Sequence, residues 1–299
     1  MNDPINKFPI FLPSITSVKN FHNYFELVNI VLESEIEAFM LSALDISYLY
    51  NNEPEPLKDI IKRAKSKILF LDSGGFEKHN IPYYNKNWEI PDLIVIAEKF
   101  KPDIIVAFDI ISKLYQNNNK NELSLFKKTL KLAERIINIE KKFEVIIHSF
   151  NIEEIFLCLQ KLKEYNEYIY AIGIPERNLG ASIRVRLLKI KQISNFVKNT
   201  LKWNDIHLHL FGCSDPSNLI EYSKIGIEIF DGVHWQDLII NPSDGKFQDY
   251  SNLLNIKCDC FYCMKFKELI NENYNYEEEF YDYYAINHNL NFYKNLWSG

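Results

Sequence analysis

Three cysteines lie close together near the C-terminal end, at Cys258, Cys260 and Cys263 in the segment KCDCFYC, and His288 follows in a helical stretch. Thiols this close in sequence are poorly placed to form disulfides with one another, but thiolates and one imidazole are ligands that zinc binds tetrahedrally. The spacing predicts a structural Cys3His zinc site. Four protein ligands leave no position for a substrate, so the chemistry must lie elsewhere.

The alternative is that these cysteines are ordinary buried thiols and that His288 is unrelated to them. The position of His288 in a helical run after the cluster favours it over the other histidines. Cys158 and Cys213 lie in apolar surroundings and are expected to be reduced core residues. The other candidate imidazoles are His79, His148, His207, His209 and His234.

Polar residues and glycines follow several short apolar runs. Asp72 ends the run in ILFLDSGGFE, Asp109 the run in DIIVAFD and Asp231 the run in IEIFD, while His148 and Gly173 end two others. If the runs are strands of a barrel, residues just past their C-terminal ends face one pocket. The alternative is that each aspartate caps the next helix or turn.

Ser73, Gly74 and Gly75 directly follow Asp72. The glycines allow the backbone to approach a flat ligand closely, or they only make a tight turn. Paired carboxylates in a pocket suit substitution at an anomeric carbon, where one attacks and the other moves the proton of the leaving group. The pattern therefore indicates glycosyl chemistry.

Short β-rich runs alternate with amphipathic segments over about 230 residues, which predicts an α/β fold, a closed (β/α)8 barrel. An open doubly wound sheet is the alternative, although it usually needs fewer strands. The expected strands cover residues 9–12, 38–44, 67–71, 103–108, 144–147, 168–172, 206–211 and 227–230. The expected helices cover residues 20–33, 57–65, 91–101, 123–141, 152–165, 182–201 and 216–224.

The β/α rhythm ends after Trp235, where NPSDGKF and the cysteine cluster follow. We therefore expect a barrel over residues 1–240 and a zinc-binding subdomain with a closing helix over 241–299. The chain begins without the basic region and apolar run of a signal peptide and has no apolar stretch of transmembrane length, so we expect a soluble, cytoplasmic protein. Its net charge of -6 argues against indiscriminate nucleic-acid binding.

The ordered motifs FPIFLPSITSVKNF, LDSGGFE, VAFD, YAIG, GIEIFD, CDCFYC and HNLNFYKNLW resemble the tRNA-guanine transglycosylases over nearly the whole chain. The resemblance implies a zinc-containing barrel that exchanges a guanine in a polynucleotide for a free 7-deazaguanine of the preQ0 or preQ1 type. The sugar-phosphate backbone stays intact in this reaction.

The same resemblance implies roles for individual residues. Asp231 becomes the nucleophile at C1′ and Asp72, with its Ser73–Gly74 turn, the general acid and base. Asp109 becomes the acceptor for the edge of the base. Gly173 and His148 join it in the base pocket, and Cys258, Cys260, Cys263 and His288 hold the zinc.

The sequence departs from the family pattern in segments that recognise tRNA in family members. The nucleophile is followed by GVHWQDLIINPSDGKF, which has no arginine where family members carry a Pro-Thr-Arg loop, and His148 replaces a glutamine. A branch of the superfamily inserts 7-deazaguanine into DNA, and a compact chain lacking the arginine loop is similar to it. We therefore favour DNA over tRNA as the polymer.

Other interpretations remain open at this stage. They are queuosine- or archaeosine-type modification of tRNA, a non-catalytic accessory subunit, and a barrel glycosidase acting on small nucleosides. The basic stretches at 61–67 and 183–191 either track a phosphate backbone or form solvated helix faces. A homodimer, or a complex with a partner protein, would use a surface such as the tyrosine-rich segment 274–284.

Overall fold

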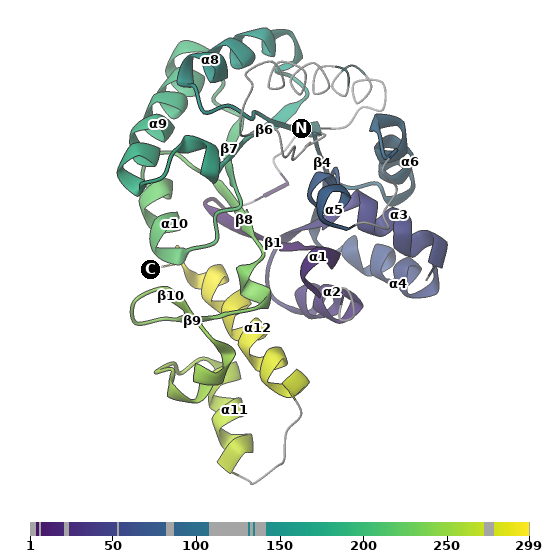
Figure 1. Cartoon of the computed structure of the whole chain (residues 1–299), viewed down its shortest axis with the longest axis vertical. Coiled ribbons are helices and arrows are strands. Elements are labelled where there is room, and N and C mark those ends of the chain that lie inside the picture. Colours follow the sequence, from purple (N-terminus) through teal and green to yellow (C-terminus); the bar gives the residue numbers. More distant parts are fainter. Residues whose placement is uncertain are drawn as a thin grey trace.

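Eight parallel strands close into a barrel in the computed structural model, with β1 paired to β8 (Figure 1). The structure describes residues 4–5, 7–20, 24–52, 54–81, 87–107, 131, 134, 142–271 and 278–298. The predicted (β/α)8 fold is therefore confirmed. The strands are β1 Ile10–Ile15, β2 Ala38–Ser42, β3 Ile68–Asp72, β4 Ile104–Val106, β5 Lys142–Ile146, β6 Ile169–Pro175, β7 His207–Phe211 and β8 Ile229–Gly232.

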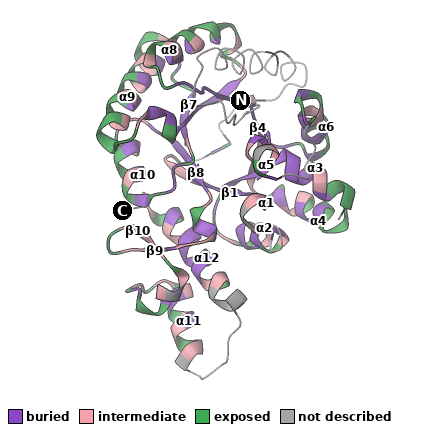
Figure 2. Ribbon diagram, viewed as in Figure 1, coloured by how far each residue is buried: buried purple, intermediate pink, exposed green. Residues whose placement is uncertain are grey.

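Helices surround the barrel, with their exposed residues on the outer side and the buried strands inside (Figure 2). Their starts are set locally by caps: the side chains of Asn151 and Asp215 accept hydrogen bonds from the second N–H of α8 and α10. The helices around the barrel are α1 Ser17–Asn20, α2 Tyr24–Glu33, α3 Ala43–Asn52, α4 Pro54–Ala64, α5 Gly75–Asn80, α6 Ile90–Phe100, α8 Ile152–Lys161, α9 Ile183–Asn195 and α10 Pro216–Ser223.

The helices α3 and α5 are among those that were not expected from the sequence. The run 38–44 ends as a strand at Ser42, and α3 begins at Ala43, where the Ser42 hydroxyl accepts a hydrogen bond from the Asp45 N–H at 3.3 Å. The short helix α5 begins directly after Gly74, whose φ of 84° lies in the left-handed region. The two helices pack against each other, and α5 contributes Phe76 and Glu77 to the cavity at the barrel mouth. The helix expected over 123–141 falls almost entirely outside the described residues.

Apolar residues fill two regions of the barrel. One cluster lies inside the strands and includes Leu12, Phe70 and Ile229. A larger one lies between the strands and the surrounding helices and includes Phe39, Leu208 and Phe230. Because the interior is packed with side chains, we expect the active site at the mouth of the barrel, at the C-terminal ends of the strands.

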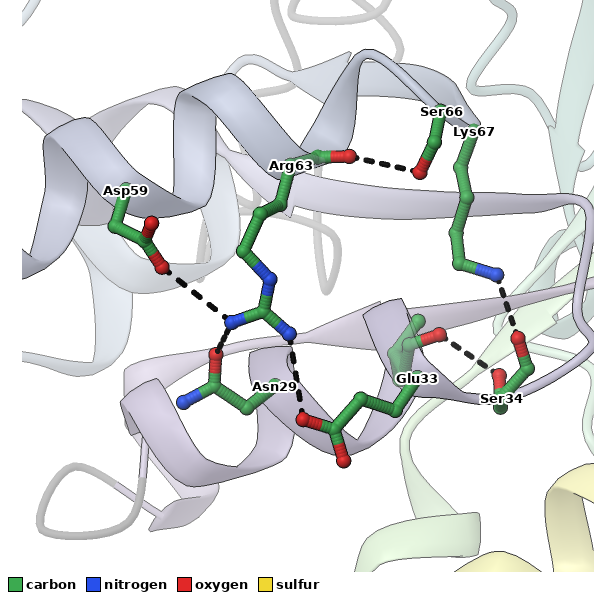
Figure 3. A network of polar contacts seen from close by, with 8 residues as sticks. Asn29, Glu33, Ser34, Asp59, Arg63, Ser66 and Lys67 are labelled. Carbon is green, nitrogen blue, oxygen red and sulfur yellow. Dashed lines mark hydrogen bonds and ion pairs between the residues drawn. The ribbon is translucent and has the colours of Figure 1, made fainter.

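The basic stretch 61–67 is occupied by contacts within the fold, as Figure 3 shows. Arg63 at the end of α4 donates to the Asn29 side chain on α2 at 2.7 Å and lies 3.4 Å from Glu33. Lys67 donates to the backbone carbonyls of Ser34 and Ile36 at 2.7 and 2.6 Å. These cations tie α4 to α2, which favours a structural role over contact with a phosphate backbone.

The C-terminal part forms a smaller unit beside the barrel (Figure 1). It contains a separate apolar cluster, which includes Leu253 from the segment after its short hairpin and Cys263 and Phe266 from α11. The helix α12 runs from this unit onto the barrel, where Tyr293 stacks on Phe11 with ring centroids 3.7 Å apart. The elements are η5 His234–Gln236, β9 Ile239–Asn241, β10 Lys246–Gln248, η6 Tyr250–Asn255, α11 Phe261–Asn271 and α12 Glu278–Asn295. The boundary at residues 240 and 241 stays a prediction.

Among the described residues, no helix combines the length and the apolar character needed to cross a bilayer.

Candidate active site

A cavity of about 320 Å³ opens at the C-terminal ends of the strands. Asp72 from the end of β3 and Asp231 from β8 both line it, together with Ser14 from β1. The alternation of side chains along each strand directs these residues inward, and the parallel strands bring their ends to one mouth. The remaining lining includes Thr16, Ser42, Phe76, Glu77, Glu176, Arg177, Arg186, Phe211 and His234.

Asp231 is held by donors from both neighbouring strands. Its Oδ2 accepts a hydrogen bond from the Ser14 hydroxyl at 2.9 Å, and its Oδ1 accepts one from the Gly212 N–H at 2.8 Å. The side chain is buried except for its face toward the cavity. A carboxylate fixed in this way keeps one orientation toward a ligand in the cavity.

Asp72 lines the cavity and also stabilises the turn that follows β3. Its Oδ2 accepts a hydrogen bond from the Gly74 N–H at 2.9 Å, so the alternative interpretation of a turn-forming aspartate is also correct. Gly74 itself does not line the cavity. A Cβ at this position would lie 2.4 Å from the Cβ of Leu44, which explains the glycine by packing.

A second acid, Glu77, lies on α5, five residues after Asp72, and was not singled out by its sequence pattern. It is buried at the cavity wall. Burial, followed by the nearby charges of Asp45 and Asp72, raises the pKa of Glu77 well above its ordinary value. Glu77 therefore holds its proton to a higher pH than an ordinary glutamate, while the Asp45 carboxylate accepts hydrogen bonds from the Ser17 hydroxyl and N–H.

A salt bridge lies at another part of the cavity wall. Glu176 follows β6 in η3 (Glu176–Leu179), and its Oε1 lies 2.5 Å from Arg186 on α9 and accepts a hydrogen bond from Tyr222 at 3.0 Å. Arg177, next to it, lines the cavity and is exposed. The mouth thus carries guanidinium groups around an acidic interior, which suits a substrate with phosphates outside the pocket.

Three other predicted site residues, Ser73, His148 and Gly173, are described by the structure and do not line the cavity. Ser73 is buried and its carbonyl accepts a hydrogen bond from the Trp88 indole at 2.7 Å. His148 is buried after β5, and Gly173 lies within β6 beneath the Phe211 ring. Their proposed contacts with a base stay predictions. Asp109 lies outside the described residues.

Two further polar residues inside the barrel were missed as site residues. Glu144 on β5 and His209 on β7 contact each other at 2.7 Å, and His209 also lies 3.3 Å from Asp231. The available signal was a glutamate and a histidine inside otherwise apolar strands, which is costly unless the residues are paired. His209 had been considered only as an alternative metal ligand.

The four predicted metal ligands come together in the smaller unit. The ligand atoms of Cys258, Cys260, Cys263 and His288 all lie within 4.8 Å of one another, and Nδ1 of His288 is 3.2 Å from the Cys263 sulfur. Nε2 of His288 lies 2.8 Å from the Ile240 carbonyl, which directs Nδ1 toward the thiols. Three thiolates and one oriented imidazole fit a structural zinc ion.

The model of the queuine tRNA-ribosyltransferase family matches residues 9–299. The chain belongs to this family. It is therefore a pentosyltransferase that exchanges a guanine base in a nucleic acid, and the family match agrees with the barrel and with the Cys3His cluster. No curated protein sequence matches the chain significantly.

Membership in the queuine tRNA-ribosyltransferase family excludes an unrelated nucleoside glycosidase, and two carboxylates line the cavity as base exchange requires.

Proposed function

We propose that the chain exchanges guanine in DNA for a free 7-deazaguanine of the preQ0 or preQ1 type, with Asp231 as nucleophile and Asp72 as general acid and base. The observation that carries the reaction is that both carboxylates line one cavity at the barrel mouth. The enzyme would act on a nucleotide turned out of its stack, because this pocket must enclose the reacting base.

The reaction proceeds by two displacements at C1′. Asp231 attacks C1′, the bond from C1′ to N9 of guanine breaks, and its electron pair stays on the base, which takes a proton from Asp72. The incoming 7-deazaguanine then gives its N9 proton to Asp72 and attacks C1′. The bond from C1′ to Asp231 breaks, which restores both carboxyl groups to their starting states.

The neighbouring acid Glu77 supports the role of Asp72. The raised pKa of the Glu77 carboxyl group disfavours a second negative charge close to Asp72, where the leaving base needs a proton. Asp109, His148 and Gly173 are proposed to contact the edge of the base, and Phe76 in the cavity wall offers a ring for stacking.

Three thiolates and an imidazole are proposed to hold zinc as a structural ion. When bound, the ion supplies a fixed crosslink between α11, α12 and the segment before α11. The chemistry is carried by residues of the barrel, since none of these four ligands lines the cavity at the mouth.

The preference for DNA rests on the segment after Asp231. It has no arginine and folds into η5 and the β9–β10 hairpin, with Trp235 and Gln236 buried. Selection of a polynucleotide depends on contacts flanking the extruded base. Modification of tRNA is the second candidate, because the matching family model describes tRNA ribosyltransferases.

Incorporation of radiolabelled guanine into bulk tRNA and into single- and double-stranded DNA tests the proposal. We expect label in DNA, lost by more than about a thousandfold in Asp231→Ala. Asp215→Ala is the matched control, because Asp215 also follows a strand but caps α10 away from the cavity. Label only in tRNA would select the second candidate, and label in neither polymer would favour an accessory subunit.

A further inference from the structure

Two polar side chains inside the barrel form a continuous line with Asp231. Glu144 and His209 are fully buried, and Nδ1 of His209 lies 2.7 Å from Oε1 of Glu144. On the other side of the ring, Nε2 of His209 lies 3.3 Å from Oδ1 of Asp231. The line runs from the barrel interior to a carboxylate that faces the cavity.

The glycine at position 173 leaves space for this pair. A Cβ at Gly173 would lie 2.8 Å from Oε1 of Glu144 and 2.2 Å from the Phe211 ring, so only glycine fits there. Phe211 stacks on His209 with centroids 4.1 Å apart. A buried ion pair adds little stability that apolar residues of similar size would not supply. Because the pair of Glu144 and His209 lies beside the Asp231 carboxylate, we explain it by function rather than by stability.

We propose that Glu144 and His209 are positioning residues that hold Asp231 for attack on C1′ and stabilise it when the glycosyl bond to it breaks. The inference rests on the proposed role of Asp231 as nucleophile. Glu144 orients the imidazole, and the imidazole acts on Oδ1 of Asp231.

The two oxygens of Asp231 then have different tasks. Oδ1 faces His209 and accepts the Gly212 N–H, while Oδ2 accepts the Ser14 hydroxyl. Attack through Oδ2 leaves Oδ1 as the carbonyl oxygen of the glycosyl ester, still beside both donors. When C1′ passes to the incoming base, the electron pair of the C1′–Oδ2 bond returns to the carboxylate, and a nearby cation favours this step.

Charges around His209 keep it protonated. Burial alone would lower the pKa of His209, but the carboxylates of Glu144 on β5 and Asp231 on β8 outweigh it and raise the pKa to about 9. Burial raises the pKa of Glu144, and the charges of His209 and His207 oppose that effect. His209 is therefore cationic at pH 7, and it loses its proton as the pH rises past about 9.

The first test is the pH dependence of base exchange in Glu144→Gln. Removal of the Glu144 charge should move the alkaline loss of kcat about 2 pH units lower than in the wild type. The KM for the polynucleotide should stay within about twofold, because neither residue touches substrate. His209→Gln should lower kcat by roughly a hundredfold and remove the alkaline limb that His209 produces.

The neighbouring pair of Glu228 and His207 provides a matched control. His207 lies two residues earlier on β7 and is 3.3 Å from Glu228, and neither residue lines the cavity. Glu228→Gln removes the carboxylate of this second pair. It should leave kcat and the pH profile of base exchange unchanged. An equal shift in Glu228→Gln and Glu144→Gln would overturn the proposal.

A measurement without substrate separates this inference from the proposed function. Imidazole NMR should show His209 titrating near pH 9 in the folded wild type and about 2 units lower in folded Glu144→Gln. An unchanged titration of His209 would overturn the positioning pair even in an active enzyme. A shifted titration in a chain that exchanges no base would support the pair and contradict the proposed function instead.

Discussion

Carboxyl groups around the barrel mouth differ in what surrounds them. Asp231 accepts two hydrogen bonds and faces a histidine, Glu144 is paired beneath it, and Glu77 is buried near two other acids. Environments of this kind separate groups that stay neutral from groups that stay charged. At the scale of single residues, the site therefore combines an acid of raised pKa near Asp72 with a cation beside Asp231.

Glu77 should reduce stability at neutral and alkaline pH. Its folded-state pKa is raised by burial and by Asp45 and Asp72, so the folded chain holds this proton more tightly than the unfolded chain. The free energy of unfolding then falls as the pH rises above about 4.3, the value for an unfolded glutamate. Glu77→Gln keeps the shape and removes this effect.

Urea unfolding from pH 5 to pH 8 measures the difference. The advantage of Glu77→Gln over the wild type should grow with pH across this range. Glu55→Gln, at an exposed position on α4, should follow the wild-type curve closely. A constant or shrinking advantage for Glu77→Gln would mean that Glu77 is charged in the folded chain.

Elements were predictable where an apolar run was bounded by polar residues on both sides. The strand in ILFLD ends visibly at Asp72, and eight such runs predicted the barrel. The boundary between β2 and α3 was not predictable, because Ser42 and Ala43 lie within one apolar stretch. The positions of polar residues at strand ends were predictable for the same reason. The pairing of Glu144 with His209 was not predictable, because it depends on which strands face each other inside the barrel.

The helix α12 is joined to the segment after the nucleophile through Asn289. Its side chain accepts the Ile240 N–H at 2.9 Å and donates to the carbonyls of Trp235 and Leu238 at 3.0 and 2.6 Å. Asn289→Ala leaves these buried groups without partners, so we expect a loss of roughly 3 kcal/mol in the free energy of unfolding. Denaturant titration measures it.

Asn295→Ala is the control on the same helix. The Asn295 side chain is exposed and donates only within α12, to the Asn291 carbonyl at 2.8 Å and its side chain at 3.3 Å. The free energy of unfolding should change little in this variant. Similar losses in both variants would mean that helix propensity, rather than the contacts of Asn289, determines the effect.

The helix α12 joins the apolar cluster of the smaller unit to the large cluster around the barrel. Cys263 and Ala285 belong to the cluster of the smaller unit, while Leu290 and Tyr293 on α12 belong to the large cluster around the barrel. His288 and Asn289 both contact Ile240, one at its carbonyl and the other at its N–H. The helix that carries the metal ligand His288 therefore also fixes the position of the segment that follows Asp231.

Loss of the metal ligands should weaken the smaller unit first. Its apolar cluster is small, and structural zinc supplies folding free energy directly in such units. We expect the wild type to carry about one zinc per chain by elemental analysis. Cys263→Ser should lower the zinc content and melt at a lower temperature, and a chelator should lower the melting temperature of the wild type in the same way. Cys158→Ser, on α8 of the barrel, should keep its zinc. Full zinc content in Cys263→Ser would contradict the Cys3His assignment, whereas zinc loss without a change in melting would mean that the unit holds its fold by apolar contacts alone.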